Sequence, residues 1–245
     1  MRDDGYFDER IAARYDEKWS GLFDPAVVDP AVDFLAENSG DGAALELGVG
    51  TGRIAIPLGE RGITVHGIEL SEAMAARLRG KSGGDAVGLT IGDFSTARVD
   101  GSFSLAYLLR NTIMNLTTQD AQVACFRNVA AHLKPGGRFV VEVMVPDLRR
   151  LPPGEIFHVF KGEEDYWGID EYDVASQILV SHHFETLAGQ IERFSVPFRY
   201  VWTSELDLMA ELAGMALLER WGSWHREPFT TESREHISMW QKPAA

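Results

Sequence analysis

The sequence predicts an α/β fold in which helices cover both faces of a mostly parallel sheet, and two observations support this prediction. From residue 43 onward, short apolar runs alternate with segments of helical periodicity, as in β-α-β units. After Pro146 this alternation gives way to short runs without a helical period, which indicates a small antiparallel β block inserted before the last helix and strands.

The first half of the chain divides into elements through its periodicity and its turn residues. Apolar residues at helical spacing predict a helix over 8–19, and Pro25 and Pro30 bracket a turn into a second helix over 28–38. Ser71 is expected to cap the helix that follows the second strand. The strands predicted up to residue 145 are 43–47, 63–69, 87–91, 103–108 and 138–145, and the helices between them are 53–60, 71–79 and 118–133.

The second half begins with a connector over 147–154 that contains several prolines. The inserted block is expected to hold strands at 156–160, 177–181, 190–194 and 198–202, with turns at Lys161-Gly162 and Ala188-Gly189. A helix over 203–214, capped by Thr203 or Ser204 and ended by Gly214, returns the chain to the main sheet. The last two strands are expected at 216–223 and 235–241.

Composition excludes several classes of function. The formal net charge of −14 argues against a general nucleic-acid binder and against binding to anionic membranes. No apolar stretch approaches the length needed to cross a bilayer, and the polar start of the chain does not resemble a signal peptide, so a cytoplasmic location is expected. Cys125 is the only cysteine, which excludes an internal disulfide, and it is expected to be a small core residue.

The most informative segment runs from Leu45 to Arg53. A short apolar strand ending in Glu46 and Leu47 leads into glycines at alternate positions, followed by a helical pattern. Glycine accepts positive φ and lets a ligand approach the backbone closely, so this turn predicts a nucleotide-like cofactor. A dinucleotide fingerprint would require a third glycine where the chain has Arg53, which argues against a dehydrogenase.

Three further signals follow in order along the chain. Glu69 ends the second strand, 17 residues after Gly52, where an acid can accept hydrogen bonds from both ribose hydroxyls. Gly92-Asp93-Phe94 follows the third strand, where the carboxylate can accept a hydrogen bond from an adenine amino group. Leu133-Lys134-Pro135-Gly136-Gly137 predicts a sharp turn from helix into strand. Each signal is weak alone, but their joint order is specific.

With these motifs the chain resembles a class I S-adenosylmethionine-dependent methyltransferase over roughly residues 6–145. The resemblance implies a three-layer, doubly wound, mostly parallel seven-stranded sheet with an antiparallel terminal strand. It implies that the glycines approach the methionine part of the cofactor, that Glu46 lies beneath its amino group and that Glu69 holds the ribose. The cofactor residues it implies are Tyr15, Glu46, Gly48, Gly50, Gly52, Glu69, Leu70, Met74, Gly92, Asp93, Phe94 and Arg110.

The resemblance also implies a lid and a reaction centre. Helix 8–19 would close over the cofactor, with Tyr15 near its methionine end and Trp19 either in the lid or in plain helix packing. The segment after the fourth strand would face the methyl sulfonium, where Asn111 could orient the acceptor or contact the cofactor carboxylate. Leu70 and Met74 could pack on the adenine, and a core role for Met74 stays open.

Methyl transfer is an in-line displacement, so positioning and exclusion of water supply much of the acceleration. An amine needs only to arrive unprotonated, whereas a hydroxyl gains more from a general base. His182 and His183 are adjacent on a predicted strand and must point to opposite faces, so at most one faces the site. Glu142 lies either in the substrate cavity or in a buried structural hydrogen bond. The candidate bases are His158, His182, His183, Glu142 and Tyr200.

No metal constellation is evident, since Arg110-Asn111 stands where a metal-dependent relative would need an acid. We therefore expect no metal. Aromatic residues across the insert suit a cover over a small-molecule acceptor, such as a natural product or sugar amine, and equally suit a core or a homodimer contact. The alternatives are a catalytically silent S-adenosylmethionine-binding regulatory module and an NAD-type oxidoreductase.

The domain boundaries follow from these elements. Residues 1–40 are expected to form an N-terminal helical lid, and residues 41–146 with 203–245 the cofactor-binding domain. Residues 147–202 would form an inserted antiparallel β region that covers the substrate or forms a dimer contact. The expected reaction is methyl transfer to a nitrogen or oxygen nucleophile.

Overall fold

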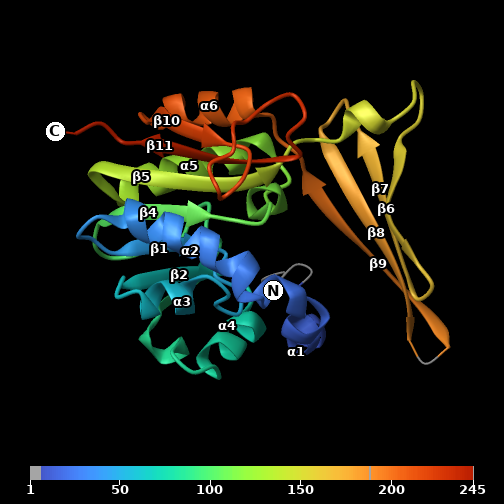
Figure 1. Ribbon diagram of the computed structural model, residues 1–245, viewed down its shortest axis with the longest axis horizontal. Coiled ribbons are helices and arrows are strands. Elements are labelled where there is room, and N and C mark those ends of the chain that lie inside the picture. Colours follow the sequence, from blue (N-terminus) through green and yellow to red (C-terminus); the bar gives the residue numbers. More distant parts are fainter. Residues whose placement is uncertain (1–6, 188, 245) are drawn as a thin grey trace.

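A computed structural model describes residues 7–187 and 189–244. It shows two sheets set side by side, a large one with helices on both faces and a smaller one that projects from it (Figure 1). The first residues of the predicted lid, and Ala188 of the predicted turn, lie outside the described residues. Among the described residues, no helix is long and apolar enough to cross a membrane.

The large sheet has seven strands in the order β10-β11-β5-β4-β1-β2-β3. Its central strands are parallel, and β11 runs antiparallel to both of its neighbours. This arrangement confirms the predicted fold class. The strands are β1 (Ala44–Leu47), β2 (Val65–Glu69), β3 (Gly88–Ile91), β4 (Phe103–Leu108), β5 (Leu133–Met144), β10 (Ala216–Trp221) and β11 (Glu235–Gln241).

Two apolar clusters form the core, one on each face of this sheet. On one face, residues of α2 (Pro25–Ser39), α3 (Ala55–Glu60) and α4 (Glu72–Arg79) pack together with alternate strand residues. On the other face lie α5 (Gln119–His132) and α6 (Thr203–Leu212). Cys125 is fully buried in that second cluster, so its predicted role as a core residue is confirmed.

Helix caps follow the local sequence closely. Asp8 accepts a hydrogen bond from the Ile11 amide at 3.0 Å and begins α1 (Glu9–Lys18). Ser71 caps α4 as predicted, accepting from the Met74 amide at 3.2 Å. The expected cap of α6 by Thr203 or Ser204 is wrong, because Thr203 is already helical and Trp202 is the N-cap, with its amide donating to Glu205.

Two predicted turns also lie inside regular structure. Pro25 opens α2, where a missing amide proton costs little, but Pro30 lies within the helix rather than before it. The segment Leu133–Gly137 is already part of β5, with Leu133 paired to Phe103 across a register shift, rather than a turn before it.

The small sheet, here called the cap sheet, is antiparallel in the order β6-β7-β8-β9. Its strands are β6 (Phe157–Glu163), β7 (Tyr166–Asp173), β8 (Ile178–Leu187) and β9 (Gln190–Arg199). The sequence prediction missed β7 and divided β9 into two strands. Pro197 lies within β9, which tolerates a proline because it is an edge strand.

The two faces of the cap sheet differ in environment. Its inner face packs against the rest of the molecule, and Tyr172 and Leu179 join the core cluster beneath α5 and α6. The outer face is open, with large apolar side chains half exposed or more, among them Phe157, Val159, Trp167 and Ile191. Because strand residues alternate between faces, a side chain's position along β7, β8 or β9 decides whether it can reach the site.

Candidate active site

A cavity of about 380 Å³ opens at the carboxyl ends of β1 and β2, beneath α1 and beside β9. In open α/β sheets, ligands bind at these strand ends. The cavity brings together residues far apart in sequence, including most of those predicted for the cofactor. It is lined by Phe7, Tyr15, Gly48, Gly50, Glu69, Leu70, Met74, Phe94, Thr112, Asn115, Thr117, Val196 and Pro197.

The glycine turn forms the floor of this cavity. Gly48, Gly50 and Gly52 all have positive φ, at 71°, 57° and 84°. Side chains there would be strained, and a Cβ on Gly52 would collide with Leu78. The sequence therefore uses glycine both for the backbone path and for close packing. The result is a bare stretch of backbone exposed to the cavity.

Glu69 connects this turn to the next strand. Its carboxylate accepts hydrogen bonds from the Gly50 amide at 2.8 Å and the Ser71 amide at 2.9 Å. Burial raises the pKa of Glu69, while these backbone amides oppose that shift. The carboxylate is therefore fixed at the rim of the cavity, oriented to accept further hydrogen bonds.

Glu46 lies deeper, inside the sheet. The Tyr107 hydroxyl donates to its carboxylate at 2.9 Å, and both side chains are buried. Burial raises the pKa of Glu46 to about 8, against the hydrogen bond from Tyr107 and the charge of Arg53. Without a further cation nearby, Glu46 is thus mainly protonated at neutral pH. A ligand ammonium beside it would favour its ionised form.

Only part of the predicted segment Gly92-Asp93-Phe94 lines the cavity. Phe94 is buried and lines the cavity, and Gly92 donates its amide to the Glu69 carbonyl at 2.8 Å. Asp93 is exposed, and one carboxylate oxygen accepts from the Ser95 amide at 2.8 Å and the Ser95 hydroxyl at 2.7 Å. Asp93 therefore shapes this turn, and its contact with adenine stays a prediction.

Helix α1 closes one side of the cavity and is held there by polar contacts. Asp16 accepts a hydrogen bond from the Thr51 hydroxyl at 2.6 Å and forms an ion pair with Lys81. The Ser71 hydroxyl donates to the Phe7 carbonyl. Tyr15 lines the cavity, and burial raises the pKa of its hydroxyl. These contacts place α1 where the predicted lid is expected, although Thr51 and Lys81 were not foreseen.

The turn after β4 has an unusual backbone. Arg110 and Asn111 are consecutive non-glycine residues with φ of 54° and 63°. The amide of Arg110 donates to a Glu142 carboxylate oxygen at 2.8 Å, and that of Asn111 donates to the Glu142 carbonyl at 3.2 Å. Such conformations persist only where the surrounding structure enforces them, and they often mark functional sites.

The same contacts bear on two candidate catalytic residues. The second carboxylate oxygen of Glu142 accepts from the Trp224 indole at 2.8 Å, so both oxygens serve structural hydrogen bonds. Asn111 accepts from the Met144 amide at 2.7 Å through its side-chain oxygen. Of the two interpretations of Glu142, this geometry favours the buried structural one. Both residues stabilise the turn that contains Arg110.

The histidines of β8 point to opposite faces, as expected. His182 lies on the outer face, bonded to Ser195 at 2.8 Å and Glu171 at 3.0 Å, away from the cofactor cavity. His183 lies on the inner face, stacked on Phe194 with ring centroids 4.6 Å apart. Burial lowers the pKa of His183 to about 4, so it is neutral at pH 7.

The remaining candidate bases have other surroundings. Tyr200 is buried in the core, where burial raises its pKa. His158 is paired across the strands with Asp170, whose carboxylate accepts from the Ser181 hydroxyl at 2.7 Å. Within the described part of the chain, no three His, Cys, Asp or Glu side chains form a metal-binding group. The absence of a metal requirement stays a prediction.

Sequence reasoning missed the contribution of Arg53. This half-buried guanidinium lies close enough to Glu46 and Glu142 for their charges to oppose a burial-driven lowering of its pKa. The sequence showed only that position 53 is not glycine. Val196 and Pro197 were missed too, because only the packing of the cap sheet brings β9 to the cavity.

Comparisons with known proteins agree with this geometry. The family described as "Methyltransferase domain" matches residues 44–137. The CcbJ methyltransferase of Streptomyces caelestis is 34% identical, and its structure superimposes with a TM-score of 0.86 over 99% of this chain and 100% of that chain. A cypemycin N-terminal methyltransferase from Streptomyces sp is 28% identical over 99% of this chain and 100% of its own length.

A more distant structure has the same fold. It is the S-adenosylmethionine-bound CalS10, an amino pentose methyltransferase from Micromonospora echinaspora, with 22% identity and a TM-score of 0.68 over 97% of this chain and 98% of that chain. These similarities, together with the glycine spacing, make the NAD-type oxidoreductase alternative wrong.

Proposed function

The chain belongs to the class I S-adenosylmethionine-dependent methyltransferases, and from this premise we propose that it methylates an amine nitrogen of a small natural-product molecule. Relatives named for N-methylation support the choice of nitrogen, among them the cypemycin N-terminal methyltransferase and the sugar N-methyltransferase KedS8 from Streptoalloteichus sp. Transfer to an oxygen is the alternative.

The observation that carries this proposal is the state of the candidate bases. Both carboxylate oxygens of Glu142 accept structural hydrogen bonds, and His182 lies on the outer face of the cap sheet. His183, on the inner face, is stacked on Phe194 and bonded through Nδ1 to the Tyr166 hydroxyl. A hydroxyl acceptor gains from a nearby general base, whereas an amine can attack the methyl carbon once it is unprotonated. The site thus suits a nucleophile that needs positioning more than proton abstraction.

In the proposed reaction, the acceptor nitrogen attacks the methyl carbon in line with the breaking sulfur–carbon bond. The electron pair of that bond stays on sulfur, giving S-adenosylhomocysteine, and the proton of the new ammonium leaves to water. The glycine turn, Glu69 and Glu46 bind the donor, while Tyr15 and Phe7 restrict water at the methyl end. No metal takes part in this scheme.

The test uses matched acceptors that carry either an amine or a hydroxyl on the same scaffold. We expect radiolabelled methyl transfer to the amine and none to the alcohol, with a rate that rises with pH as the amine's own proton is lost. Methyl ethers as the main product would contradict the choice of nitrogen. Cofactor binding without transfer to any amine would favour the silent regulatory module.

We also propose the division into a lid over residues 1–40, a cofactor domain and a cap over 147–202. The outer face of the cap sheet exposes Phe157, Val159 and Trp167, which suits a homodimer contact. Light scattering should then show a dimer that Trp167→Lys dissociates, and a monomeric parent protein would contradict this. A cytoplasmic location, and the absence of nucleic-acid and membrane partners, stay predictions.

A further inference from the structure

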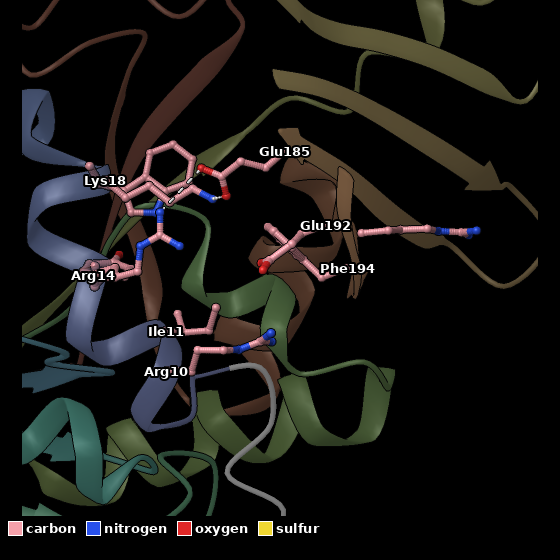
Figure 2. Close-up of a pocket in the computed structure, with 10 residues that line it drawn as sticks. Arg10, Ile11, Arg14, Lys18, Glu185, Glu192 and Phe194 are labelled. Carbon is pink, nitrogen blue, oxygen red and sulfur yellow. Dashed lines mark hydrogen bonds and ion pairs between the residues drawn. The ribbon is translucent and has the colours of Figure 1, made fainter. Parts of the chain in front are cut away.

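A second cavity, of about 270 Å³, lies between α1 and the ends of β8 and β9 (Figure 2). Tyr15 lines both this cavity and the cofactor cavity, so the two share a wall. Its volume is below the range of about 300–1,000 Å³ typical of sites for whole ligands. It therefore suits one part of a molecule whose other part reaches the methyl group.

The helix side of this cavity carries a row of cations. Arg10, Arg14 and Lys18 recur at four-residue spacing, which places them on one face of α1. The ammonium of Lys18 lies 2.8 Å from the Glu185 carboxylate, so these two charges neutralise each other. Arg14 reaches Glu185 only at 4.0 Å, and Arg10 has no hydrogen-bond or ion-pair partner for its side chain among residues 7–187 and 189–244.

The sheet side carries two carboxylates. Glu185 and Glu192 are paired directly across β8 and β9, where like charges are unfavourable without a counterion. Glu185 has Lys18, whereas Glu192 has no ion pair in the described part of the chain. Two guanidinium groups then remain against one carboxylate, a local excess of one positive charge in a chain of net charge −14.

The cavity also has apolar walls. Ile11 and Trp19 contribute from the helix side, and Phe194, which stacks on His183, contributes from β9. Arg193 also borders the cavity, but its guanidinium points away from it and lies over the Phe184 ring on the outer face of the cap sheet. The cavity thus combines an apolar surface with guanidinium groups, which bind carboxylates through paired hydrogen bonds.

We infer that this cavity is a recognition subsite for an acceptor that carries a carboxylate on an apolar or aromatic group. Arg10 and Arg14 bind the carboxylate, Phe194 and Trp19 contact the apolar part, and the acceptor amine extends past Tyr15 to the methyl group. The single excess charge matches a monoanion better than a dianionic phosphate. The inference rests on the proposed amine methylation and adds the class of acceptor.

The test compares two probes that differ only in charge, 3-phenylpropionate and its neutral amide 3-phenylpropanamide. Each is titrated by calorimetry into protein saturated with S-adenosylhomocysteine. We expect the carboxylate to bind at least tenfold more tightly than the amide. Arg10→Gln with Arg14→Gln should abolish this preference, and the corresponding lysine variants should retain part of it.

Arg193→Gln is the matched control, because it removes a neighbouring guanidinium from the opposite face of the same strand. It should leave the preference unchanged. Equal binding of both probes, or a preference that survives the double substitution, would overturn the subsite. Failure of the parent protein to bind S-adenosylhomocysteine would instead contradict the proposed function, so the two failures are distinguishable.

Discussion

The large sheet and the cap sheet differ in how their strands are buried. Every residue of β1 and β4 is buried, whereas β6 has none that is fully buried and β9 has only two. Helices cover both faces of the large sheet, while one face of the cap sheet is open. Substitutions in the large sheet should therefore be strongly destabilising, whereas many side chains of the cap sheet can be replaced with little loss of stability.

The two cavities also differ in which groups supply their polar contacts. At the cofactor cavity, the Glu69 carboxylate is fixed by the backbone amides of Gly50 and Ser71, which hold the glycine turn against the end of β2. The charged groups of the second cavity are instead on long side chains of α1, β8 and β9. Substitutions in the first site should affect donor binding, and those in the second, apart from the shared Tyr15, should affect only acceptor binding.

The largest expected effect is that of Gly50→Val. A branched side chain at φ of 57° is strained and would project into the cofactor cavity. We expect affinity for S-adenosylhomocysteine to fall by roughly 3 kcal/mol or more, about 100-fold. Calorimetric titration measures it. Gly62→Val, which also has positive φ but lies in an open turn, is the control for strain and should bind normally.

Next is Arg110→Gln, which tests whether the strained turn presents this guanidinium to the methionine carboxylate. Loss of a hydrogen bond to a charged group should weaken S-adenosylhomocysteine binding by about 1.5–3 kcal/mol. Binding of 5′-methylthioadenosine, which lacks the amino-acid end, should not change. Equal loss for both ligands would show that the turn matters only for folding.

Asp93→Ala should weaken cofactor affinity by roughly 1–3 kcal/mol if the carboxylate accepts a hydrogen bond from adenine. Because Asp93 also fixes the Ser95 turn, Asp93→Asn is the informative partner. An asparagine keeps the turn contact through its side-chain oxygen but presents a different group to adenine. Unchanged titration curves for both variants would remove Asp93 from the site.

The raised pKa of Glu46 leads us to expect that cofactor binding releases a proton. Its pKa, raised to about 8 by burial, leaves it protonated at pH 7, and the cofactor ammonium should favour ionisation. Binding should therefore release up to about one proton and strengthen as pH rises from 6 to 8. Calorimetry in buffers of different ionisation enthalpy measures this. Glu46→Gln should abolish the release, and no buffer dependence in the parent would refute the assignment.

The smallest expected effect compares one histidine in each sheet, buried His236 and half-buried His183. Burial lowers the pKa of both His183 and His236 to about 4, below the 6.5 of an exposed histidine. The unfolded chain therefore takes up protons first, and stability is lost as pH falls from 6.5 towards 4. At pH 5, we expect the protonation of His236 to lower the free energy of unfolding by about 1 kcal/mol. The effect of His183 should be smaller, because His183 is less buried.

Denaturant unfolding at pH 7 and pH 5 tests this order. His236→Gln should reduce the pH dependence of the free energy of unfolding more than His183→Gln does. The reverse order would show that the cap sheet is the more tightly packed of the two. A pH dependence unaltered by either variant would assign the effect to other groups.

The sequence predicted the large sheet closely. The bounds of β4 and β11 agree with the prediction, and α1 differs by one residue at each end. β4 and β11 have strong apolar patterns because both of their faces are buried. Prediction was poorer in the cap sheet, where β7 was missed, because half-exposed strands tolerate acids and glycines such as Glu171 and Gly168 among their apolar residues.

The sequence by itself determined the methyl donor, because the glycine turn and the acids at the strand ends are local features whose spacing fixes their geometry. Only the tertiary structure decided which face each cap-sheet histidine occupies, that Glu142 holds the Arg110 turn, and that the cations of α1 face Glu185 and Glu192. These relations join different elements of the chain, from 11 residues apart for His182 and Glu171 to 167 for Lys18 and Glu185. Their geometry depends on strand register and on the packing of one sheet beside the other, which no local pattern contains.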